Sequence, residues 1–453
     1  MFSKRMTVLF IAILFIPCGA FAALADYIQR PDDVYAYEIV ETRTQGGNTM
    51  DVIRLKSQTW QGMVWKHWLV MVRPPEVVHP GKALMLIGGG DNRDMPPTFQ
   101  NREAEIIGMV AAQTKSVVCA LFQVPNQPLF DGLKEDEIIA LTYDKFLRGE
   151  GDDWPLLLPM VKSAVRAMDA IQAILKEKHN QEVTGFLLTG GSKRGWTTWL
   201  AAASGDPRVQ AIAPSVIDVL NMTPQMEHQL ACYGGYSEQI DEYTDLSIQS
   251  HMNTPEGQRL LSIVDPYAYR EKITIPKLIL LGTNDPYWTV DAANFYFPGL
   301  KGEKHLYYQA NVGHDVNLDG VSTLVHFYAS FLTGKPFPKI SWQSDGQGTL
   351  EVTWEREDGK ALLWQAHSPN RDFRSSTWTS IPLEGVKKAS VRMAPPETGW
   401  KAFYVEVQFP GDIGMNFGSC TEMTVIPKTF PTEARAYDPV AQKDTDTAQA
   451  SGS

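Results

Sequence analysis

A series of short, nearly continuous apolar runs, separated by segments of helical periodicity, constrains the fold of this chain more than any other feature. The runs are KALMLIGGG (82–90), SVVCALFQVP (116–125), VTGFLLTGG (183–191), VQAIAPSV (209–216), PKLILLGTND (276–285) and KHLYYQANVGHD (304–315). Apolar side chains recur at helical spacing over residues 156–178, 192–204 and 321–332. Continuous apolar strands are typically buried on both faces, and strands that alternate with helices form mostly parallel sheets. The sequence therefore predicts a doubly wound α/β fold whose mostly parallel sheet is covered on both faces.

The remaining segments add smaller units to this sheet, and a chain of 453 residues is long enough for more than one domain. Residues 34–75 alternate apolar and polar side chains, which predicts an antiparallel meander. Residues 221–265 have weak periodicity, which is typical either of an inserted cap or lid over a site or of a surface excursion. Residues 339–430 carry short alternating segments, as in an antiparallel β-sandwich of the immunoglobulin or fibronectin III kind. We therefore expect an α/β domain over 26–338, this sandwich domain and a disordered tail over 431–453.

Residues 1–25 have the pattern of a cleavable signal peptide. Two cations precede the apolar run TVLFIAILFIP, which is too short to span a bilayer. Small residues at AFA (20–22) and at ALA (23–25) offer two cleavage sites. Two alternatives remain open: the apolar run could be retained as a membrane anchor, or Cys18 could be the lipid-modified residue of a lipoprotein. We expect a secreted or periplasmic protein without a stable membrane span after cleavage.

Charge and cysteine spacing exclude several kinds of partner and cofactor. The net charge of -11 argues against a nucleic-acid surface. Once the signal is removed, Cys119, Cys232 and Cys420 remain, so at most one disulfide forms within the chain and its pairing stays open. No Cys-x-x-Cys pair is present, and the cysteines are widely spaced. We therefore expect no metal and no cofactor.

Ser192 lies where a nucleophile elbow would place it. The strand pattern of Phe186–Thr189 runs into Gly190 and Gly191, and a helical pattern follows the serine. Such a turn lifts a hydroxyl above the sheet edge, next to free N–H groups at a helix start. The usual motif is Gly-x-Ser-x-Gly, but here Arg194 takes the last position and the next glycine follows it. A phosphate-binding turn and a purely structural turn remain alternatives.

Two further residues complete a catalytic set of Ser, Asp and His. Asp285 follows one buried strand, and His314 follows the next one along the chain. A serine needs a base to take its proton and an acid to orient that base. The order Ser192, Asp285, His314 is that of the α/β-hydrolases. Asp218 is the rival acid, and it is also a candidate substrate-binding residue.

Acyl transfer also requires hydrogen-bond donors for an oxyanion. We expect one from the backbone N–H of Lys193 and a second from Gly89 or Gly90 in the glycine loop LIGGGDN. A plain glycine turn is the alternative for that loop. The side chains of Lys193 and Arg194 would add positive charge near the anion, bind an acidic substrate group, or be solvated on the helix surface.

The stretches TGGSKRGWTTWLAA, LILLGTNDPYW, ANVGHDV and LLWQAHSPNRDFRSSTW resemble the PhoPQ-activated pathogenicity-related proteins. The resemblance extends over roughly residues 30 to 428. It implies a member of the α/β-hydrolase superfamily, mostly exported and bacterial, with Ser192, Asp285 and His314 as functional residues and without a cofactor. The family name implies control by a two-component system and a link to virulence. The elbow alone is also similar to that of the glucuronoyl esterases, which have a basic residue directly after the serine, as Lys193 is here.

These patterns together predict an exported serine hydrolase that forms an acyl-enzyme. The attacked bond is an ester or an amide of a small-molecule, glycan or peptide substrate, with the ester favoured because neither an acidic peptide pocket nor a propeller gate is visible. The alternative is a non-catalytic binding or signalling protein on a hydrolase scaffold. Labelling of Ser192 by a fluorophosphonate distinguishes the two.

Overall fold

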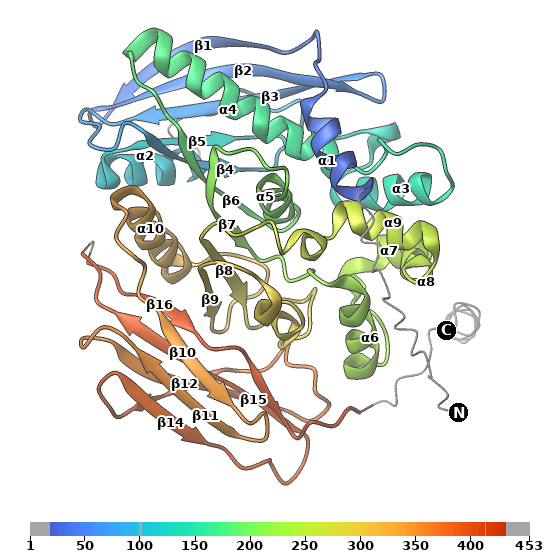
Figure 1. Ribbon diagram of the computed structural model, residues 1–453, viewed down its shortest axis with the longest axis vertical. Helices are drawn as coiled ribbons and strands as arrows, with labels where there is room; N and C mark the ends of the chain where they lie inside the picture. Colours follow the sequence, from blue (N-terminus) through green and yellow to red (C-terminus); the bar gives the residue numbers. More distant parts are fainter. Residues whose placement is uncertain (1–18, 99–101, 413, 432–453) are drawn as a thin grey trace, which may run out of the picture.

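A nine-stranded sheet runs through the centre of the molecule in the computed structural model, which describes residues 19–98, 102–412 and 414–431 (Figure 1). Its strand order is β1-β2-β3-β5-β4-β6-β7-β8-β9. The strands are β1 (Ala36–Gln45), β2 (Asn48–Trp60), β3 (Met63–Arg73), β4 (Lys82–Ile87), β5 (Val117–Leu121), β6 (Gly185–Gly191), β7 (Val209–Ser215), β8 (Lys277–Gly282) and β9 (Lys304–Gln309). β5, β4, β6, β7, β8 and β9 pair in parallel with one another. The mostly parallel α/β fold that the apolar runs predict is therefore confirmed.

The antiparallel meander at the start of the chain extends this sheet instead of forming a separate layer. Two-residue turns at Gly46–Gly47 and Gln61–Gly62 join its strands, and all four residues have positive φ, as tight hairpin turns of this length require. β3 then pairs antiparallel with β5. The pairing of the meander with the parallel strands was not apparent from its alternating pattern.

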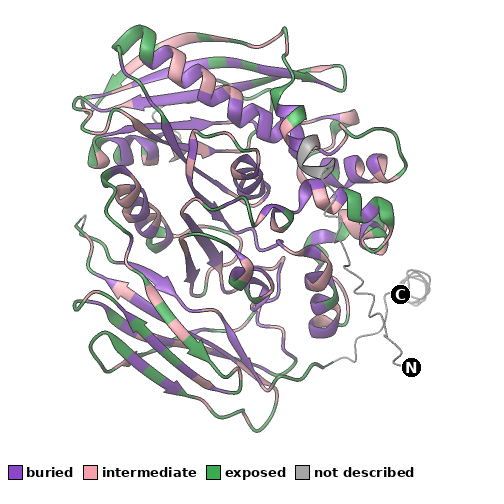
Figure 2. Ribbon diagram, in the orientation of Figure 1, coloured by how far each residue is buried: buried purple, intermediate pink, exposed green. Residues whose placement is uncertain are grey.

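Helices cover both faces of the sheet (Figure 1). α4 (Leu157–His179) and α5 (Lys193–Ala203) lie on one face, and α2 (Arg102–Thr114) and α10 (Leu318–Thr333) lie on the other. α4, α5 and α10 agree with the helices expected from periodicity. α2 and α3 (Glu135–Leu147) were not predicted, because their apolar positions are interrupted by charged and polar residues. Figure 2 shows that the central strands are buried along most of their length.

The chain between β7 and β8 forms a group of short helices. They are α6 (Met222–Tyr233), α7 (Asp241–Asp245), α8 (Ile248–His251) and α9 (Pro255–Val264), with 3-10 turns at Glu238–Ile240 and Pro266–Tyr269. Thr254 caps α9 by accepting a hydrogen bond from the N–H of Gly257, and Pro255 occupies the first turn. Other 3-10 turns are Phe130–Gly132, Ala292–Phe295 and Phe297–Gly299. This group is the insertion that broke the strand–helix rhythm.

The C-terminal part consists of two antiparallel sheets, drawn in orange and red in Figure 1. One contains β10 (Ile340–Ser344), β11 (Thr349–Trp354) and β14 (Lys388–Arg392), and the other β12 (Lys360–Ser368), β13 (Thr379–Leu383), β15 (Trp400–Phe409), β16 (Phe417–Cys420) and β17 (Thr424–Ile426). β11 and β14 alternate buried and exposed side chains, as strands with one solvated face do. β15 is buried on both faces, because Tyr404 also contacts Tyr308 of β9. The division of the chain after residue 338 stays a proposal.

The predicted signal peptide falls largely on residues 1–18, which lie outside the described residues, as do Cys18 and the tail from 432. Residues 19–25 lie within α1 (Gly19–Gln29). Leu24 in this helix is fully buried, and Tyr27 donates a hydrogen bond to Gln58 Oε1 at 2.9 Å. No helix in the described part of the chain combines the length and the apolar composition needed to cross a membrane.

Candidate active site

Ser192 occupies a sharp turn between β6 and α5. Its φ of 56° and ψ of −129° lie in a region that side chains other than glycine rarely adopt. The N–H of Ser192 donates to the carbonyl of Ser215 at the end of β7, and its own carbonyl accepts from Trp196 in α5, at 2.9 and 3.0 Å. The turn is thus held from both sides, which is the arrangement of a nucleophile elbow.

Close packing around this turn explains why its second glycine comes one position late. A Cβ on Gly195 would lie 2.7 Å from Ile217 Cγ2 and 2.9 Å from the carbonyl oxygen of Gly190. A Cβ on Gly190 would lie 2.8 Å from the carbonyl oxygen of Arg194. The first turn of α5 therefore approaches β6 and β7 so closely that only glycine fits at both positions. Gly195 provides the close approach that the usual motif places one residue earlier.

Asp285 and His314 lie together at the ends of β8 and β9. His314 Nδ1 is 2.8 Å from Asp285 Oδ2, and Asp285 Oδ1 accepts a hydrogen bond from the N–H of Tyr287 at 3.0 Å. Asp285 is buried, whereas His314 is partly exposed. The ring of Tyr287 stacks on the imidazole, with ring centroids 4.3 Å apart and planes inclined by 33°. His314 is thus oriented by a carboxylate on one side and by an aromatic face on another.

The loops that carry these residues are joined to each other by the backbone. The N–H of Asn284 donates to the carbonyl of Val312 at 3.0 Å, and a Cβ on Gly282 would lie 2.2 Å from the carbonyl oxygen of Gly313. Only glycine permits this approach between the two loops. The contact explains how residues 29 positions apart in sequence form the Asp285–His314 pair.

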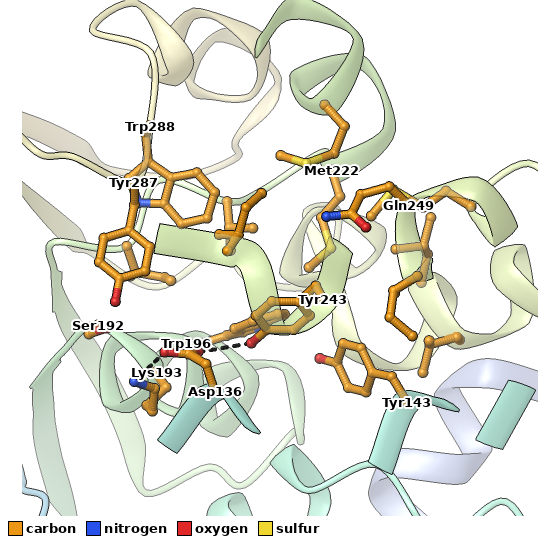
Figure 3. A pocket seen from close by; sticks show the side chains of 18 of the residues that line it. Asp136, Tyr143, Ser192, Lys193, Trp196, Met222, Tyr243, Gln249, Tyr287 and Trp288 are labelled. Atoms are coloured by element: carbon orange, nitrogen blue, oxygen red, sulfur yellow. Dashed lines mark hydrogen bonds and ion pairs between the residues drawn. The ribbon is translucent and has the colours of Figure 1, made fainter. Parts of the chain in front are cut away.

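Ser192 and His314 line the same cavity, which we call the Ser192 cavity. The structure does not join them by a hydrogen bond, since the buried Nε2 atom of His314 has no partner among the described residues. The space inside the cavity that the centre of a water-sized molecule can reach is about 70 Å³. Helices of the 221–265 insertion form much of its wall. Figure 3 shows Ser192 and Tyr287 at one side of this cavity and Gln249 at the other.

Lys193 and Arg194 are engaged in ion pairs with carboxylates of α3, and a role of their side chains in binding an acidic substrate group stays a prediction. Lys193 is buried, and its Nζ lies 2.9 Å from Glu135 Oε2 and 2.8 Å from Asp136 Oδ2. Figure 3 shows the contact with Asp136. Arg194 donates to Glu135 Oε1 at 2.5 Å and to the carbonyl of Val124 at 2.6 Å. Burial opposes the ionisation of Glu135, but hydrogen bonds and charges of the two cations outweigh it and lower its pKa to about 2. A solvated helix surface is wrong for these residues, and Arg194 does not line the Ser192 cavity.

Of the candidate oxyanion donors, Lys193 lines the Ser192 cavity, whereas Gly89 and Gly90 do not. Lys193 is the first residue of α5, so its backbone N–H has no acceptor within the helix and lies directly beside Ser192. Gly89 and Gly90 do not line the Ser192 cavity but a neighbouring one, between the sheet and the helices α2 and α10. A Cβ on Gly89 would lie 2.7 Å from Arg194 Nη2. Gly89 is therefore required for packing, because a larger residue there would collide with the Arg194 side chain. The role of Gly89 or Gly90 as an oxyanion donor stays a prediction.

Asp218, the rival acid, is buried behind the Asp285–His314 pair. It borders a small space that Asp285 and Trp288 also line, and it does not line the Ser192 cavity. Burial raises the pKa of Asp218 to about 8, and the charges of Asp285 and Asp291 act in the same direction. Because Nδ1 of His314 bonds to Asp285, the geometry favours Asp285 over Asp218 as the acid.

One cluster of possible metal ligands lies outside this site. His228, Cys232 and Asp291 place three ligand atoms within 4.8 Å of one another. Arg371 enters the cluster and donates to Asp291 Oδ2 at 2.8 Å and to Cys232 Sγ at 2.5 Å. A guanidinium at this position repels a cation, so the arrangement fits a buried ion pair rather than a metal site. Cys119, Cys232 and Cys420 are all buried and form no disulfide with one another.

Comparisons with known proteins identify the family. The model of the family described as "PhoPQ-activated pathogenicity-related protein" matches residues 24–374. The chain belongs to this family. It is 31% identical, over 458 aligned positions, to Autocrine proliferation repressor protein A of Dictyostelium discoideum, covering 90% of this chain and 91% of that protein.

Solved structures with a similar fold include esterases. Acetyl xylan esterase 1 from Thermoanaerobacterium sp. has a TM-score of 0.49 and 15% identity, over 69% of this chain and 92% of that one. A glucuronoyl esterase from Solibacter usitatus has a TM-score of 0.42 and 14% identity, over 68% of this chain and 91% of that one.

One segment that marked the resemblance to the PhoPQ-related family, NRDFRSSTW (370–378), contacts the loops of the site. Asn284, next to Asp285, donates to the carbonyl of Ser376 at 2.7 Å. Asn311, near His314, donates to the carbonyl of Trp378 at 3.0 Å and accepts from the Trp378 N–H at 2.7 Å.

Sequence reasoning missed this contact, as well as Glu135, Asp136 and Tyr287. The acidic run at 135–137 was the only available signal for the two carboxylates, and it does not identify their partners.

Proposed function

We propose that this protein is an exported serine hydrolase in which Ser192, His314 and Asp285 form the catalytic triad. The observation that carries the proposal is the 2.8 Å hydrogen bond between His314 Nδ1 and Asp285 Oδ2, with His314 and the strained Ser192 on one cavity. The family membership supports it at the level of the scaffold. We favour an ester over an amide, and no step of the reaction requires a cofactor.

The geometry suggests the role of each group. The Asp285 carboxylate accepts the Nδ1 proton of His314, which leaves the unpartnered Nε2 as the base. Ser192 Oγ attacks the carbonyl carbon while its proton passes to Nε2, and the N–H of Lys193 donates to the oxyanion. The same proton then reaches the leaving alkoxide, the C–O bond breaks, and water releases the acyl group by the reverse sequence. The proton that Ser192 loses thus departs with the alcohol, and a proton from the hydrolytic water replaces it through Nε2.

A fluorophosphonate probe tests this proposal together with p-nitrophenyl esters. The folded wild type should label at Ser192 and hydrolyse at least one ester, whereas Ser192→Ala should lose both. Ser204→Ala is the matched control, since Ser204 caps the C-terminal end of α5 and its hydroxyl bonds only to local backbone, donating to the carbonyl of Ala201 at 2.7 Å and accepting from the N–H of Asp206 at 3.2 Å. Labelling that persists in Ser192→Ala, or a folded wild type that neither labels nor turns over, contradicts the proposal.

A second candidate is a signalling protein that binds its target without catalysis. It is favoured by the name of the Dictyostelium relative, which denotes an autocrine repressor of proliferation. A folded wild type in which Ser192 does not react with the probe would support this candidate. The virulence association in the family name stays a prediction for this chain.

A further inference from the structure

The Ser192 cavity is mostly apolar, with its reactive groups at one side. Trp196 of α5 and side chains of α6, α8 and α9 form its walls, among them Met222, Met226 and Met252. Methionine side chains are flexible and polarisable, so they adapt to apolar groups of different shapes. Lys193 does not offer a free charge here, because Glu135 and Asp136 neutralise it. A charged substrate group would therefore lose its hydration on entering without gaining a counter-ion.

Several buried polar atoms on this wall have no hydrogen-bond partner among the described residues. They are Tyr143 Oη, Gln249 Oε1 and Trp288 Nε1, in addition to His314 Nε2. Buried polar groups in folded proteins are almost always paired, so a group of unpaired ones on one cavity points to a ligand that pairs them. Figure 3 shows Tyr143 and Gln249 on the side of the cavity away from Ser192.

The orientation of the Gln249 amide follows from its neighbour Thr244. The hydroxyl of Thr244 donates to the carbonyl of Ile240 at 3.2 Å, so it acts as an acceptor toward Gln249. Gln249 Nε2 fills that role by donating to Thr244 Oγ1 at 3.0 Å. The Oε1 atom is thus the free end, and it accepts hydrogen bonds. A ligand group that meets it has to carry a donor, such as a hydroxyl.

We propose that the Ser192 cavity binds the acyl half of an ester whose chain is apolar along its length and ends in a hydrogen-bond donor paired by Gln249 and Tyr143. This inference rests on the proposed hydrolase function. The acyl half stays bonded to Ser192 Oγ until water arrives, so it is the half that suits a site roofed by the insertion. The alcohol has to leave first and departs through the mouth. Acetyl groups, charged sugars and charged peptides do not match this wall.

Matched esters measure the proposal directly. p-Nitrophenyl octanoate and p-nitrophenyl ω-hydroxyheptanoate have the same number of non-hydrogen atoms and differ by a terminal hydroxyl in place of a methyl. We expect kcat/KM to be about tenfold or more higher for octanoate than for p-nitrophenyl acetate, and higher again for the hydroxylated ester. A preference for acetate, or equal rates for the two long esters, overturns the inference.

Variants localise the effect to the two polar residues. Tyr143→Phe and Gln249→Leu should each lower the ratio of kcat/KM for the hydroxylated ester to kcat/KM for octanoate about tenfold, with both esters measured on the same variant. Tyr35→Phe is the matched control, because the Tyr35 hydroxyl donates to the carbonyl of Arg166 within α4 and Tyr35 does not line the cavity. Unchanged preference in both site variants overturns the inference.

The labelling rate of Ser192 by alkyl fluorophosphonates with and without a terminal hydroxyl gives the same comparison without turnover. It also separates two failures. If Ser192 does not label at all, the proposed function fails; if it labels without chain or hydroxyl preference, only the acyl specificity fails.

Discussion

At the scale of single residues, Ser192 is held in a backbone conformation that costs about 1–3 kcal/mol when nothing compensates it. Its φ of 56° persists because Ser215 and Trp196 bond to its backbone and because Gly190 and Gly195 let α5 approach the sheet. Strain of this kind is retained at the end of a strand where it places a side chain for reaction. In the proposed mechanism the Ser192 hydroxyl is activated by His314, which Asp285 orients. A substitution of Asp285 tests that role.

Asp285→Asn should lower kcat for ester hydrolysis by about 10³–10⁴-fold, because the amide no longer holds His314 in the tautomer that leaves Nε2 free as a base. KM and the thermal midpoint should change little, since the side chain keeps its size. Asp315→Asn, adjacent to His314 but exposed, is the matched control and should retain activity. Steady-state kinetics measure kcat for the two variants. Equal kcat values for Asp285→Asn and Asp315→Asn would contradict the role of Asp285 in the proposed triad.

Asp218→Asn should change how stability depends on pH. The pKa of Asp218 is raised to about 8 in the folded protein, against about 4 when unfolded, so the folded state holds the extra proton between these values. Wild-type stability contributed by this group is therefore present below pH ~4 and is lost as pH rises toward ~8. The free energy of unfolding of the variant does not fall in this way. Relative to the wild type it should therefore rise by up to about 1.4 kcal/mol per pH unit between pH ~4 and ~8. Urea unfolding at several pH values measures the difference, and a constant difference would show that Asp218 is ionised throughout.

At the scale of elements, α5 is attached to α3 through charged side chains rather than through apolar packing alone. Lys193 and Arg194, at the start of α5, reach Glu135 and Asp136 at the start of α3. Tyr243 of α7 donates to the remaining oxygen of Asp136 at 2.9 Å, which connects the insertion to the same group. The elbow, α3 and the insertion therefore share one hydrogen-bonded network beside the Ser192 cavity.

Lys193→Met should destabilise the protein by about 1–3 kcal/mol, because it leaves Asp136 without its cation inside a partly buried network. The backbone N–H of residue 193 remains, so the activity of the folded variant should fall less than that of Asp285→Asn. Lys178→Met, an exposed lysine of α4, is the control and should be neutral. Chemical unfolding and a double-mutant cycle with Asp136→Asn measure the coupling; additive effects would mean that the pair contributes no coupling energy.

At the scale of the whole molecule, the C-terminal sheets are part of the support of the site. Segment 370–378 bonds to Asn284 and Asn311 in the loops that carry Asp285 and His314, and Arg371 pairs with Asp291 in a buried cluster. Tyr308 of β9 packs against Tyr404 of β15. The position of Asp285 and His314 therefore depends on residues contributed from both parts of the chain.

Deletion of residues 340–453 should yield insoluble protein, since it exposes β9 and leaves Asp291 buried without its guanidinium. Arg371→Met removes only that cation and should cost about 3–5 kcal/mol in the intact chain. Solubility, the unfolding midpoint and Ser192 labelling are the measurements. A soluble truncated chain that still labels would show that the C-terminal sheets are separable from the hydrolase.

The N-terminal helix distinguishes the two predicted cleavage sites. Leu24 is fully buried in α1, so cleavage after Ala25 would remove a core side chain that cleavage after Ala22 retains. We expect the exported protein to begin at Ala23. Its intact mass checks this, and a mature chain that begins at Asp26 would contradict it.

The sequence by itself determined the parallel strands and the position of the elbow, because continuous apolar runs and glycines report local burial and backbone geometry. The order Ser192, Asp285, His314 came from the same local patterns. Segments with interrupted periodicity, such as α3, and weakly patterned strands such as β16 were not predicted, since their burial depends on neighbours.

Only the tertiary structure decided which groups meet. The sequence could not tell whether Lys193 and Arg194 face substrate or solvent, and the fold gave them Glu135 and Asp136, more than fifty positions away. It also placed Asp218 in the interior next to Asp285 and the insertion over an apolar cavity. Charge pairing, burial of a carboxyl and the shape of a cavity all arise from contacts between segments distant in sequence, and no local pattern encodes them.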